Sequence, residues 1–560
     1  MKIFLAQQNY HIGNFKKNVA KIIDAINTAK AAGGDLVVFS ELCICGYPAN
    51  DLLLQRNFIE QCKMAVDEVV AHTKDIAVIV GAPIYSSTAM GKGLFNAAFF
   101  IEDGEIKQII HKTCLPDYDV FDERRYFDPA VSWDIISFRK RKIAVTICED
   151  IWCVEPDFNY PYCPLDRLKP LGPDVIINLS ASPFDYLHAT KRMGVVKANA
   201  LKYELPVLYC NTTGAQTDLV FDGGSMGMDS NGTLCGLLKY FEEDLSCFTL
   251  NDDGSLSCED FSNYKQITTI NEECTHFNPE YGIELVYNAL VLGIRDYFKK
   301  MGFQKAVIGS SGGIDSAVVL ALACEALGND NVVAVMMPSE YSTAHSLEDA
   351  KQLNENLQNP NHTIPIKDIY ETFLKTLNPF FDNLPFNVTE ENLQSRIRGN
   401  TLMAIANKFN YILLNTSNKS ELCTGYGTLY GDMAGGLSVL GDCYKQQVYA
   451  LAKFINRKKK VIPLHIISKP PSAELRPDQK DTDSLPDYTM LDEILFGYIE
   501  QHKTAAQIKA SGCAADMVER VLKMVNRNEY KRAQFCPIIR ISPKAFGIGR
   551  RMPVVAFNTL

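Results

Sequence analysis

The sequence predicts an α/β protein built from two layered domains. The chain has 560 residues, more than a single hydrophobic core normally supports. Short apolar runs typical of buried strands alternate with amphipathic helical segments in both halves. A polar stretch without periodicity interrupts this alternation near residues 250–280. We therefore expect a first domain over residues 1–250, a linker over 251–283 and a second domain over 284–560.

The first half opens with an apolar strand at residues 1–7, MKIFLAQ. An amphipathic helix is expected over residues 14–33, where a glycine ends the periodic pattern. Further strands and one more helix continue the alternation, which is typical of a layered α/β domain. The strands are expected at 35–41, 77–84, 94–103, 142–150, 174–182 and 206–213, and the helix at 187–203.

The second half starts with a helix over residues 284–302 and a strand over 305–310. Further strands are expected at 332–339 and 411–417. Residues 469–487 are rich in Pro, Asp and Ser, which predicts a long loop inside the domain. We expect this loop to act as a lid over a bound nucleotide.

Composition limits the possible partners and location. The net charge of −10 argues against sequence-independent nucleic-acid binding, which needs a basic face. The N-terminus lacks the apolar core of a signal peptide, and no apolar run approaches a membrane span. The 17 cysteines are scattered, and the pairs at 43/45 and 148/153 lack a second pair at zinc-site spacing. We therefore expect a cytoplasmic protein with reduced, buried thiols.

The stretch VIGSSGGIDSAVVL at residues 307–320 places a glycine-rich loop between a strand and a helix. Gly312 and Gly313 allow a tight turn and a close approach to a ligand. Backbone N–H groups at the start of the helix would face an anion, and Asp315 could bind Mg²⁺. The alternative is a plain glycine turn. The loop lacks the Walker A pattern and resembles the loop of enzymes that cleave ATP to AMP and pyrophosphate.

Three reactive side chains of the first half lie at or beside the ends of predicted strands. Cys148 ends one strand, Glu41 ends another, and Lys112 follows a third. A cysteine before a sharp turn can be an exposed nucleophile, a nearby glutamate can take its proton, and a lysine can stabilise an oxyanion. Separately, each has a structural alternative: a buried strand cysteine, a helix cap and a solvated lysine.

Together these segments resemble the nitrilase superfamily of carbon–nitrogen hydrolases over residues 1–250. The matching stretches are SELCICGYP, CLPDYDVFDERRYF, ICEDIW and NLSASPF. The resemblance implies an α-β-β-α sandwich with Glu41 as general base, Lys112 as oxyanion stabiliser and Cys148 as nucleophile. The backbone N–H of Glu149 is expected to help hold the oxyanion.

A second acid of the same region, Glu123, has two possible roles. It matches a residue that orients the site in many nitrilases. It could instead be an ion-pair partner of Arg124 or Arg125.

Essentially the whole chain resembles the family of glutamine-dependent NAD⁺ synthetases. Second-half matches are MMPSEYST, ENLQSRIRG, TSNKSELCTGYGTLYGDMAGG, KPPSAELRPDQKDTDSLPDY, NEYKRAQ and SPKAFGIGRRMP. The resemblance implies a Rossmann-like second domain of the adenine nucleotide alpha hydrolase type. It also implies amidation of deamido-NAD⁺ with ATP and glutamine, giving NAD⁺, AMP, pyrophosphate and glutamate. Mg²⁺ would accompany ATP, and no tightly bound organic cofactor is expected.

The matched motifs also carry residue roles onto this sequence. Glutamine is expected to contact Tyr118, Ser182 and His188. ATP is expected to contact Gly309, Ser310, Ser311, Gly312, Gly313, Ile314, Asp315, Ser316 and Thr416. Deamido-NAD⁺ is expected to contact Asn392, Glu421, Tyr426, Gly427, Thr428, Leu429 and Lys531. The candidate Mg²⁺ ligands are Asp315 and Glu421. The alternatives here are a helix cap for the NTSNKSE segment and a solvated helix lysine for Lys531.

The chain departs from the family after SASPF, where Leu187-His188 replaces the frequent Gly-Lys pair. Either His188 or Lys191 could then face the glutamine carboxylate. The KRAQFCPII segment also lacks the usual proline-rich continuation, so it leaves the shape of the C-terminal pocket open. The family implies a homo-oligomer, at least a dimer through the synthetase domain with deamido-NAD⁺ bound across the interface, and larger assemblies such as an octamer. No nucleic acid or membrane partner is expected.

Three other functions compete with this interpretation. The first is a different amidating or thiolating enzyme with the same ATP loop. The second is a non-catalytic scaffold that keeps both folds. The third is an amidase regulated by a nucleotide-binding domain, which would respond to ATP without cleaving it.

Overall fold

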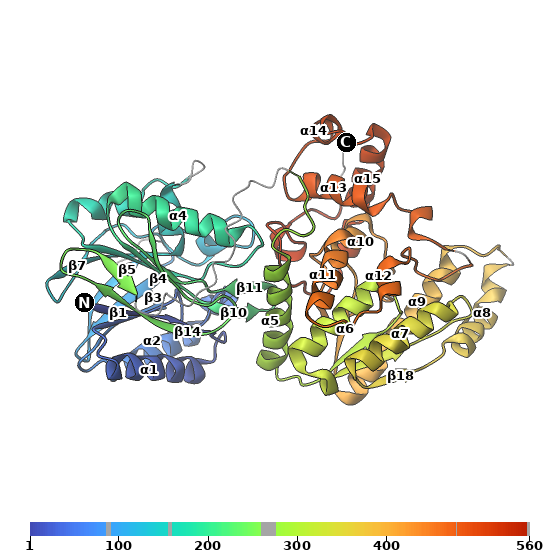
Figure 1. Ribbon diagram of the computed structural model, residues 1–560, viewed down its shortest axis with the longest axis horizontal. Helices are drawn as coiled ribbons and strands as arrows, with labels where there is room; N and C mark the ends of the chain where they lie inside the picture. The colour runs from blue at the N-terminus through green and yellow to red at the C-terminus, as the bar shows by residue number, and fades with distance from the viewer. Residues whose placement is uncertain (86–90, 155–158, 259–275, 383, 478, 557–560) are drawn as a thin grey trace. The chain divides into compact units, whose positions relative to one another are not determined.

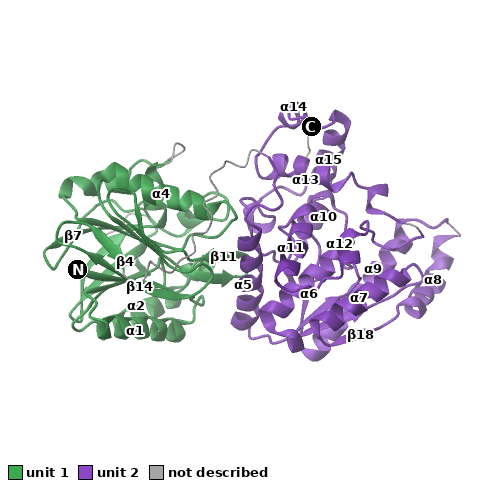
Figure 2. Ribbon diagram, in the orientation of Figure 1, with its two compact units in different colours: residues 1–271 green, residues 272–560 purple. Residues whose placement is uncertain are grey.

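The computed structural model describes residues 1–85, 91–154, 159–258, 276–382, 384–477 and 479–556. The chain divides into two compact units, residues 1–271 and 272–560 (Figure 2). Within the described residues, no helix is both long enough and apolar enough to cross a membrane.

The first unit contains two mixed β-sheets, each covered by helices on its outer face (Figure 1). The seven-stranded sheet has the order β15 (Leu256–Cys258), β14 (Asp244–Leu250), β1 (Lys2–Gln7), β2 (Leu36–Phe39), β3 (Ala77–Tyr85), β4 (Leu94–Glu102), β5 (Glu105–His111). The six-stranded sheet has the order β13 (Leu234–Leu237), β12 (Met226–Met228), β9 (Val207–Asn211), β8 (Val175–Ser180), β7 (Arg141–Ile147), β6 (Ile136–Phe138). A small hairpin joins β10 (Thr213–Gln216) to β11 (Leu219–Asp222). The helices are α1 (Phe15–Ala31), α2 (Arg56–Val70), α3 (Pro164–Leu168) and α4 (His188–Tyr203).

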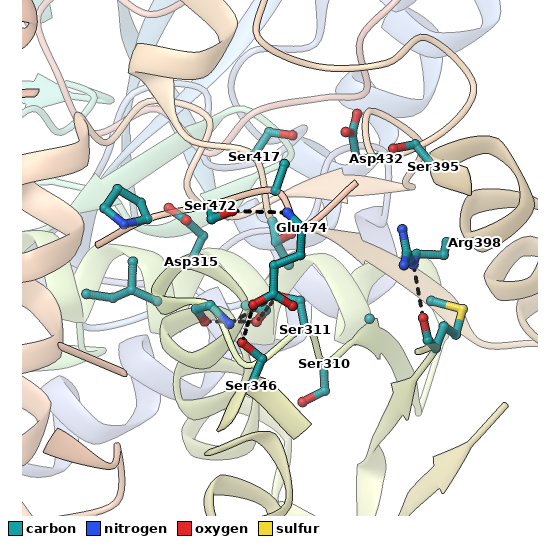
Figure 3. A pocket seen from close by; sticks show the side chains of 18 of the residues that line it. Ser310, Ser311, Asp315, Ser346, Ser395, Arg398, Ser417, Asp432, Ser472 and Glu474 are labelled. Atoms are coloured by element: carbon teal, nitrogen blue, oxygen red, sulfur yellow. Dashed lines mark hydrogen bonds between the residues drawn. The ribbon is translucent and has the colours of Figure 1, made fainter. Parts of the chain in front are cut away.

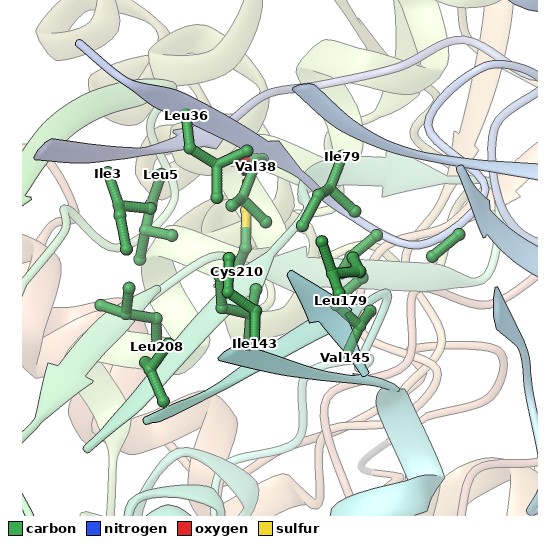
Figure 4. Packing of buried hydrophobic residues seen from close by; sticks show 14 of the residues in the cluster. Ile3, Leu5, Leu36, Val38, Ile79, Ile143, Val145, Leu179, Leu208 and Cys210 are labelled. Atoms are coloured by element: carbon green, nitrogen blue, oxygen red, sulfur yellow. Dashed lines mark hydrogen bonds between the residues drawn. The ribbon is translucent and has the colours of Figure 1, made fainter. Parts of the chain in front are cut away.

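Alternation along the strands explains the four layers. On β1, Ile3 and Leu5 point into the core between the two sheets, which Figure 4 shows. Phe4 and Ala6, on the opposite face, pack in the core that includes α1 and α2. The second sheet buries its outer face against α3 and α4. Strands buried on both faces have continuous apolar sequences, so the sequence predicts them clearly. The structure confirms the predicted α-β-β-α class.

The structure differs from the linker expected over residues 251–283 at its first described end. Strands β14 and β15 form an antiparallel hairpin that extends the first unit to residue 258. Its turn is closed by hydrogen bonds from Asn251 N to Ser255 O (2.9 Å) and from Ser255 N to Asp253 Oδ1 (2.9 Å). The polar residues that suggested a linker are therefore turn residues. The central part of the expected linker, 259–275, lies outside the described residues.

The expectation that the cysteines are all free is also wrong. Cys153 and Cys163 are joined by a disulfide, with their Cα atoms 5.7 Å apart. The two residues are ten positions apart, and only the fold brings their side chains together. Other cysteines, including Cys43, Cys45 and Cys148, are buried free thiols, as predicted.

The second unit is built on a parallel five-stranded sheet. Its order is β18 (Asn361–Thr363), β17 (Val332–Met336), β16 (Ala306–Gly309), β19 (Ile412–Asn415), β20 (Leu437–Ser438). The helices are α5 (Ile283–Met301), α6 (Ile314–Leu327), α7 (Ala344–Leu357), α8 (Lys367–Phe381), α9 (Val388–Phe409), α10 (Lys419–Thr424), α11 (Lys445–Lys458), α12 (Leu464–Ser468), α13 (Tyr488–Ile499), α14 (Ala505–Ala510), α15 (Ala515–Arg527) and α16 (Glu529–Arg532).

The parallel sheet positions the second site. Strand β16 lies between β17 and β19, so the carboxyl ends of all three strands meet at one edge. The loops after them carry the glycine-rich segment, residues 337–343 and residues 416–418. In open parallel sheets this edge is where ligands bind. Helix α6 is apolar around most of its circumference and largely buried, so it fixes the glycine-rich loop rigidly to the core.

Candidate active sites

In the first unit, Lys112 lies fully buried between two carboxylates. Its ammonium donates to Glu41 Oε1 (2.7 Å) and to Glu123 Oε1 (2.8 Å). Burial alone would lower the pKa of Lys112, but the charges of Glu123 and Glu41 outweigh it and raise this pKa well above its usual value. A buried lysine that stays charged is suited to stabilising a developing oxyanion.

Glu41 is held by three donors. Besides Lys112, Asn96 Nδ2 donates to Oε1 (2.7 Å) and the Ala181 backbone N–H donates to Oε2 (3.0 Å). Its carboxylate is thus fixed in orientation, as a general base requires.

Glu123 takes the first of its two possible roles. Its Oε1 accepts from Lys112 and from the Tyr47 hydroxyl (3.1 Å). The neighbouring arginines pair with other acids, Arg124 with Asp117 and Arg125 with Asp51. Burial raises the pKa of Glu123 to about 7, because Lys112 only partly offsets the loss of hydration.

Cys148 comes directly after β7 and begins a short 3₁₀ segment, Cys148–Val154. Its φ of 46° lies in the left-handed region, where residues other than glycine are strained, and such strain concentrates at functional sites. Burial, followed by the charge of Glu41, raises the pKa of its thiol well above the usual value, while Lys112 acts in the opposite direction. The resting group is therefore a thiol that needs a base.

Asp150, which the sequence did not single out, ties the lysine and cysteine segments together. Its Oδ1 accepts from the backbone N–H of Thr113 (3.0 Å) and Cys114 (2.7 Å), and its Oδ2 from that of Ile147 (3.0 Å). The chain just after Lys112 is thereby fixed to the chain just before Cys148. The only sequence signal was a second acid after Cys148.

An acidic side chain, that of Glu149, follows the cysteine directly. Glu149 is buried, and its Oε1 accepts from the hydroxyls of Tyr118 (3.0 Å) and Tyr160 (3.3 Å). Burial raises the pKa of Glu149, while Lys112 and the two tyrosines lower it. Tyr118, predicted to bind glutamine, therefore contacts the residue that directly follows Cys148.

Ser182 and His188, the other residues predicted to bind glutamine, contact each other. Ser182 Oγ and His188 Nε2 lie 2.8 Å apart, and Asp185 Oδ2 lies 3.8 Å from His188 Nδ1. The His188 ring stacks on Trp152 of the 3₁₀ segment, with centroids 5.2 Å apart. The Lys191 ammonium lies 5.5 Å from the centroid of the same tryptophan. Both candidate cations thus belong to one cluster beside the cysteine segment.

In the second unit, the glycine-rich loop opens into a cavity of about 320 Å³ (Figure 3). Gly312 has a φ of 78°, which favours glycine, and a side chain there would collide with the Ser346 carbonyl. Ser311 Oγ accepts from the Gly313 N–H (3.1 Å) and lies 3.1 Å from Ser316 Oγ. The first turn of α6 thus presents backbone N–H groups and hydroxyls to an anion.

Two acids of this cavity converge on one buried cation, Lys445. Its ammonium lies 2.6 Å from Asp315 Oδ2 and 3.6 Å from Glu421 Oε1. Asn418 Nδ2 also donates to Asp315 Oδ1 (2.9 Å). Burial raises the pKa of Glu421 to about 8, with Asp315 adding to the effect and Lys445 opposing it. Two carboxylates that share a cation fit Mg²⁺, which takes one or two carboxylates together with substrate phosphates.

Both interpretations of the NTSNKSE segment apply at once. Asn418 and Glu421 form a capping box at the start of α10, with Glu421 Oε2 accepting from the Asn418 N–H (3.2 Å). The other oxygen of Glu421 faces Lys445 in the cavity. The cap therefore fixes the orientation of a carboxylate that also faces the site.

Most residues predicted to bind ATP line this cavity. These are Gly309, Ser310, Ser311, Gly313, Ile314, Asp315, Ser316 and Thr416. Glu421 and Tyr426, which were predicted to bind deamido-NAD⁺, line the same cavity. Gly312 does not line it but packs against Ser346.

The residues predicted to bind deamido-NAD⁺ form a neighbouring group. Thr428 Oγ1 donates to Asn392 Oδ1 (2.7 Å), which links α9 to the 426–429 turn. The Lys531 ammonium donates to the carbonyls of Gly425 and Gly427 (2.7 Å each). A shallow pocket beside it is lined by Ser417, Glu421, Leu422, Gly425, Tyr426, Gly427, Met433 and Lys531.

Sequence reasoning missed several residues of the second site. Lys445 bridges the two acids, and Arg398 points into the cavity while donating to the Met337 carbonyl (3.0 Å) (Figure 3). Burial lowers the pKa of Arg398 to about 10. Lys445 follows an unremarkable GDCY segment, so nothing local distinguished it from a surface lysine. Arg398 lay inside the quoted ENLQSRIRG motif and could have been proposed there.

Comparisons with known proteins cover both units. A carbon–nitrogen hydrolase family model matches residues 2–255, and an NAD synthase family model matches residues 286–535. The glutamine-dependent NAD(+) synthetase of a Synechocystis species is 43% identical over 560 residues, covering 99% of this chain and 98% of that protein. The enzyme of the same name from Thermotoga maritima is 41% identical, with 99% and 98% coverage.

Solved structures give the same result. The glutamine-dependent NAD⁺ synthetase of Acinetobacter baumannii, determined in complex with ADP, is 37% identical and matches with a TM-score of 0.76 over 99% of this chain and 98% of that chain. A structure from Cytophaga hutchinsonii with a TM-score of 0.81 is 19% identical and supports the fold. The chain therefore belongs to the glutamine-dependent NAD⁺ synthetase family.

Proposed function

We propose that the first unit hydrolyses glutamine and that the second unit uses the ammonia to amidate deamido-NAD⁺ at the cost of ATP. The products are NAD⁺, AMP, pyrophosphate and glutamate. The observation that carries the proposal is the pair of charge clusters, each built on a buried lysine: Glu41–Lys112–Glu123 beside Cys148 and Asp315–Lys445–Glu421 beside the glycine-rich loop. Family membership supports the choice of substrates.

The first cluster supports a thioester mechanism. Glu41 takes the Sγ proton of Cys148, and the thiolate attacks the amide carbon of glutamine. The Lys112 ammonium and the Glu149 N–H stabilise the oxyanion, and Glu41 returns the proton to the departing nitrogen as ammonia leaves. Water, activated by Glu41, then attacks the thioester and releases glutamate and the thiol.

Glutamine carries two charged groups that this site can pair. Glu149, held by Tyr118 and Tyr160, would accept hydrogen bonds from the α-ammonium group. Ser182 and His188, which contact each other, would donate to the α-carboxylate. The two sets of groups discriminate glutamine from simple amides, which lack both charges.

Replacing His188 by alanine is expected to raise the KM for glutamine about tenfold with little change in kcat, because one of the proposed donors to the α-carboxylate is lost. Steady-state glutaminase assays of the wild type and the variant measure this.

Lys191→Met is the matched test of the second candidate cation. If this variant, and not His188→Ala, raises the KM for glutamine, Lys191 holds the carboxylate.

In the second unit, the nicotinate carboxylate oxygen of deamido-NAD⁺ attacks the α-phosphorus of ATP and pyrophosphate leaves. Ammonia then attacks the acyl carbon, AMP leaves, and a proton is lost. The first turn of α6 and Lys445 would hold the phosphates. Mg²⁺, held by Asp315 and Glu421 with the phosphate oxygens, would neutralise charge that develops on the leaving pyrophosphate. Asn392, Thr428 and Lys531 would bind deamido-NAD⁺, with Lys531 exchanging its carbonyl contacts for the substrate.

We also propose a homodimer formed through the second unit. An apolar surface runs over α8 and the start of α9, and consists of Ile369, Phe373, Phe380, Leu384, Phe386 and Val388. Phe380 is 83% exposed and Leu384 70% exposed, and only Tyr370 of α8 is buried. Exposed apolar surfaces of this kind commonly mark protein interfaces. The surface is continuous with α9, which carries Asn392, so a second copy would lie beside the proposed deamido-NAD⁺ site.

The double substitution Phe373→Asp and Phe380→Asp is expected to convert the dimer to a monomer, because it places two charges in the interface. Sedimentation velocity measures the mass. Val131→Asp, at an 85% exposed position of the first unit, is the control that should leave the mass unchanged. A wild-type protein that sediments as a monomer at micromolar concentration would contradict the dimer.

The first test of the function is NAD⁺ formation from deamido-NAD⁺ and Mg-ATP with either glutamine or ammonium. Formation of NAD⁺ and AMP from both donors supports the proposal. Glutamine hydrolysis that responds to ATP without AMP release would indicate a regulated amidase instead, and no turnover of either kind would indicate a scaffold. We place this activity in the cytoplasm, because it consumes ATP and because most described cysteines are free thiols.

A further inference from the structure

A carboxylate from the proposed lid reaches across the nucleotide cavity to the N-terminus of α7. We call residues 469–477 the strap. Glu474 of the strap accepts from Ser346 Oγ (2.6 Å), Thr343 Oγ1 (2.9 Å) and the Thr343 N–H (3.2 Å). Figure 3 shows its side chain extending into the cavity towards Ser346. All its donors belong to the cap and first turn of α7, where a negative charge is stabilised.

The residue that Glu474 contacts also touches the glycine-rich loop. A side chain on Gly312 would lie 2.2 Å from the Ser346 carbonyl, so this loop and the first turn of α7 are in direct backbone contact. Ser310, Ser311, Ser346 and Glu474 line the same cavity. An anion lying on the first turn of α6 would therefore lie close to the Glu474 carboxylate.

Other contacts hold the strap at positions on both sides of Glu474. The Lys469 ammonium lies 2.9 Å from Asp349 Oδ2, and Gln394 Nε2 donates to the Leu475 carbonyl (2.9 Å). Between these anchors, Glu474 has a φ of 49°, in the left-handed region that disfavours residues with a side chain. The hydrogen bonds of the Glu474 carboxylate thus offset the energetic cost of this backbone conformation.

Glu474 lines the same cavity as the glycine-rich loop while the strap is in this position. The polyphosphate of ATP would repel the Glu474 carboxylate and compete for the same hydroxyl and N–H donors.

We propose that Glu474 is an internal latch that holds the strap across the nucleotide cavity and that the polyphosphate of the nucleotide displaces. This inference rests on the proposed function, because it takes ATP and pyrophosphate as the ligands. Because a fraction of the protein is latched, the apparent affinity for nucleotide is lowered. Once the Glu474 carboxylate is displaced, the strap can move and make room for substrate. Binding of the phosphates and movement of the strap are thereby coupled through one carboxylate.

The test compares Glu474→Gln with Glu348→Gln in the full-length protein. Glu348 is an exposed acid on the same helix, so its variant removes one charge near α7 without touching the strap. Hydrogen exchange of the ligand-free proteins reports on the amides of residues 343–347 and 469–477. Titration calorimetry with Mg²⁺ and inorganic pyrophosphate reports on affinity.

The latch predicts that Glu474→Gln speeds exchange in both segments and lowers the Kd for pyrophosphate about tenfold, while Glu348→Gln changes neither. In the wild type, pyrophosphate should speed exchange at 469–477. Unchanged exchange in Glu474→Gln, or weaker pyrophosphate binding, overturns the latch, and weaker binding would make Glu474 a ligand contact. The exchange comparison needs no nucleotide. A protein that binds neither Mg-ATP nor pyrophosphate would therefore contradict the proposed function separately.

Discussion

The Cys148→Ala enzyme is expected to lose glutamine-driven NAD⁺ formation by at least about 10³-fold, because no other group can form the thioester. Ammonium-driven formation should be unchanged, because the second site contains its own cluster of charged groups and needs only ammonia. The measurement is NAD⁺ production from deamido-NAD⁺ and Mg-ATP at saturating glutamine or ammonium. The same assay reports both units in one sample.

The control for this experiment is Cys235→Ala. Cys235, on β13, is a half-buried thiol of the same unit that donates to the Thr233 carbonyl (3.5 Å). It should keep both activities. If Cys148→Ala retained glutamine-driven synthesis, the nucleophile would have to be another residue. If it lost both activities, an intact Cys148 would be needed by the second site as well.

Replacing Lys445 by methionine is expected to reduce NAD⁺ formation from either donor by about 10²- to 10³-fold, as for loss of one preorganised charge at a transition state. The substitution removes the ammonium that lies between Asp315 and Glu421. Without Mg²⁺, it should also destabilise the second unit by about 3 kcal/mol, because two largely desolvated carboxylates then lack their common counterion. Kinetics with both donors and thermal unfolding with and without Mg²⁺ measure the two effects.

Mg²⁺ should restore part of the lost stability in Lys445→Met, since it fits between the same two carboxylates. Lys453→Met, at an exposed position of the same helix, is the matched control. Glutaminase activity should survive in both variants, which shows that the first unit is folded. Equal activity of Lys445→Met and the wild type would show that Lys445 has only a structural role.

The elements around both sites were predictable from local pattern. Strand β7 is an apolar run followed directly by Cys148, and strand β16 is an apolar run that leads into the glycine-rich loop. Both candidate sites can therefore be located from local sequence. Buried strands and helix caps depend on neighbours in the sequence, which is why the pattern reveals them. The same logic failed at residues 251–258, where a polar hairpin turn resembles a linker.

The contacts that set the chemistry could not be predicted in this way. The acid that pairs with Lys112 depends on the packing of separate strands. The sequence allows Glu123 two roles, and its contact with Lys112 in the structure selects the first. Lys445 lies 130 residues from Asp315 along the chain, and nothing in its local sequence marks it.

The sequence by itself determined the α/β class and the family resemblance and supplied the candidate nucleophile and candidate phosphate loop, because these depend on short motifs and their periodicity. Only the tertiary structure decided the cation that joins Asp315 to Glu421, the disulfide between Cys153 and Cys163, and the position of Glu474 against α7. These depend on which distant segments the hydrophobic cores bring together. Charge pairing and hydrogen bonding then act over only a few ångströms.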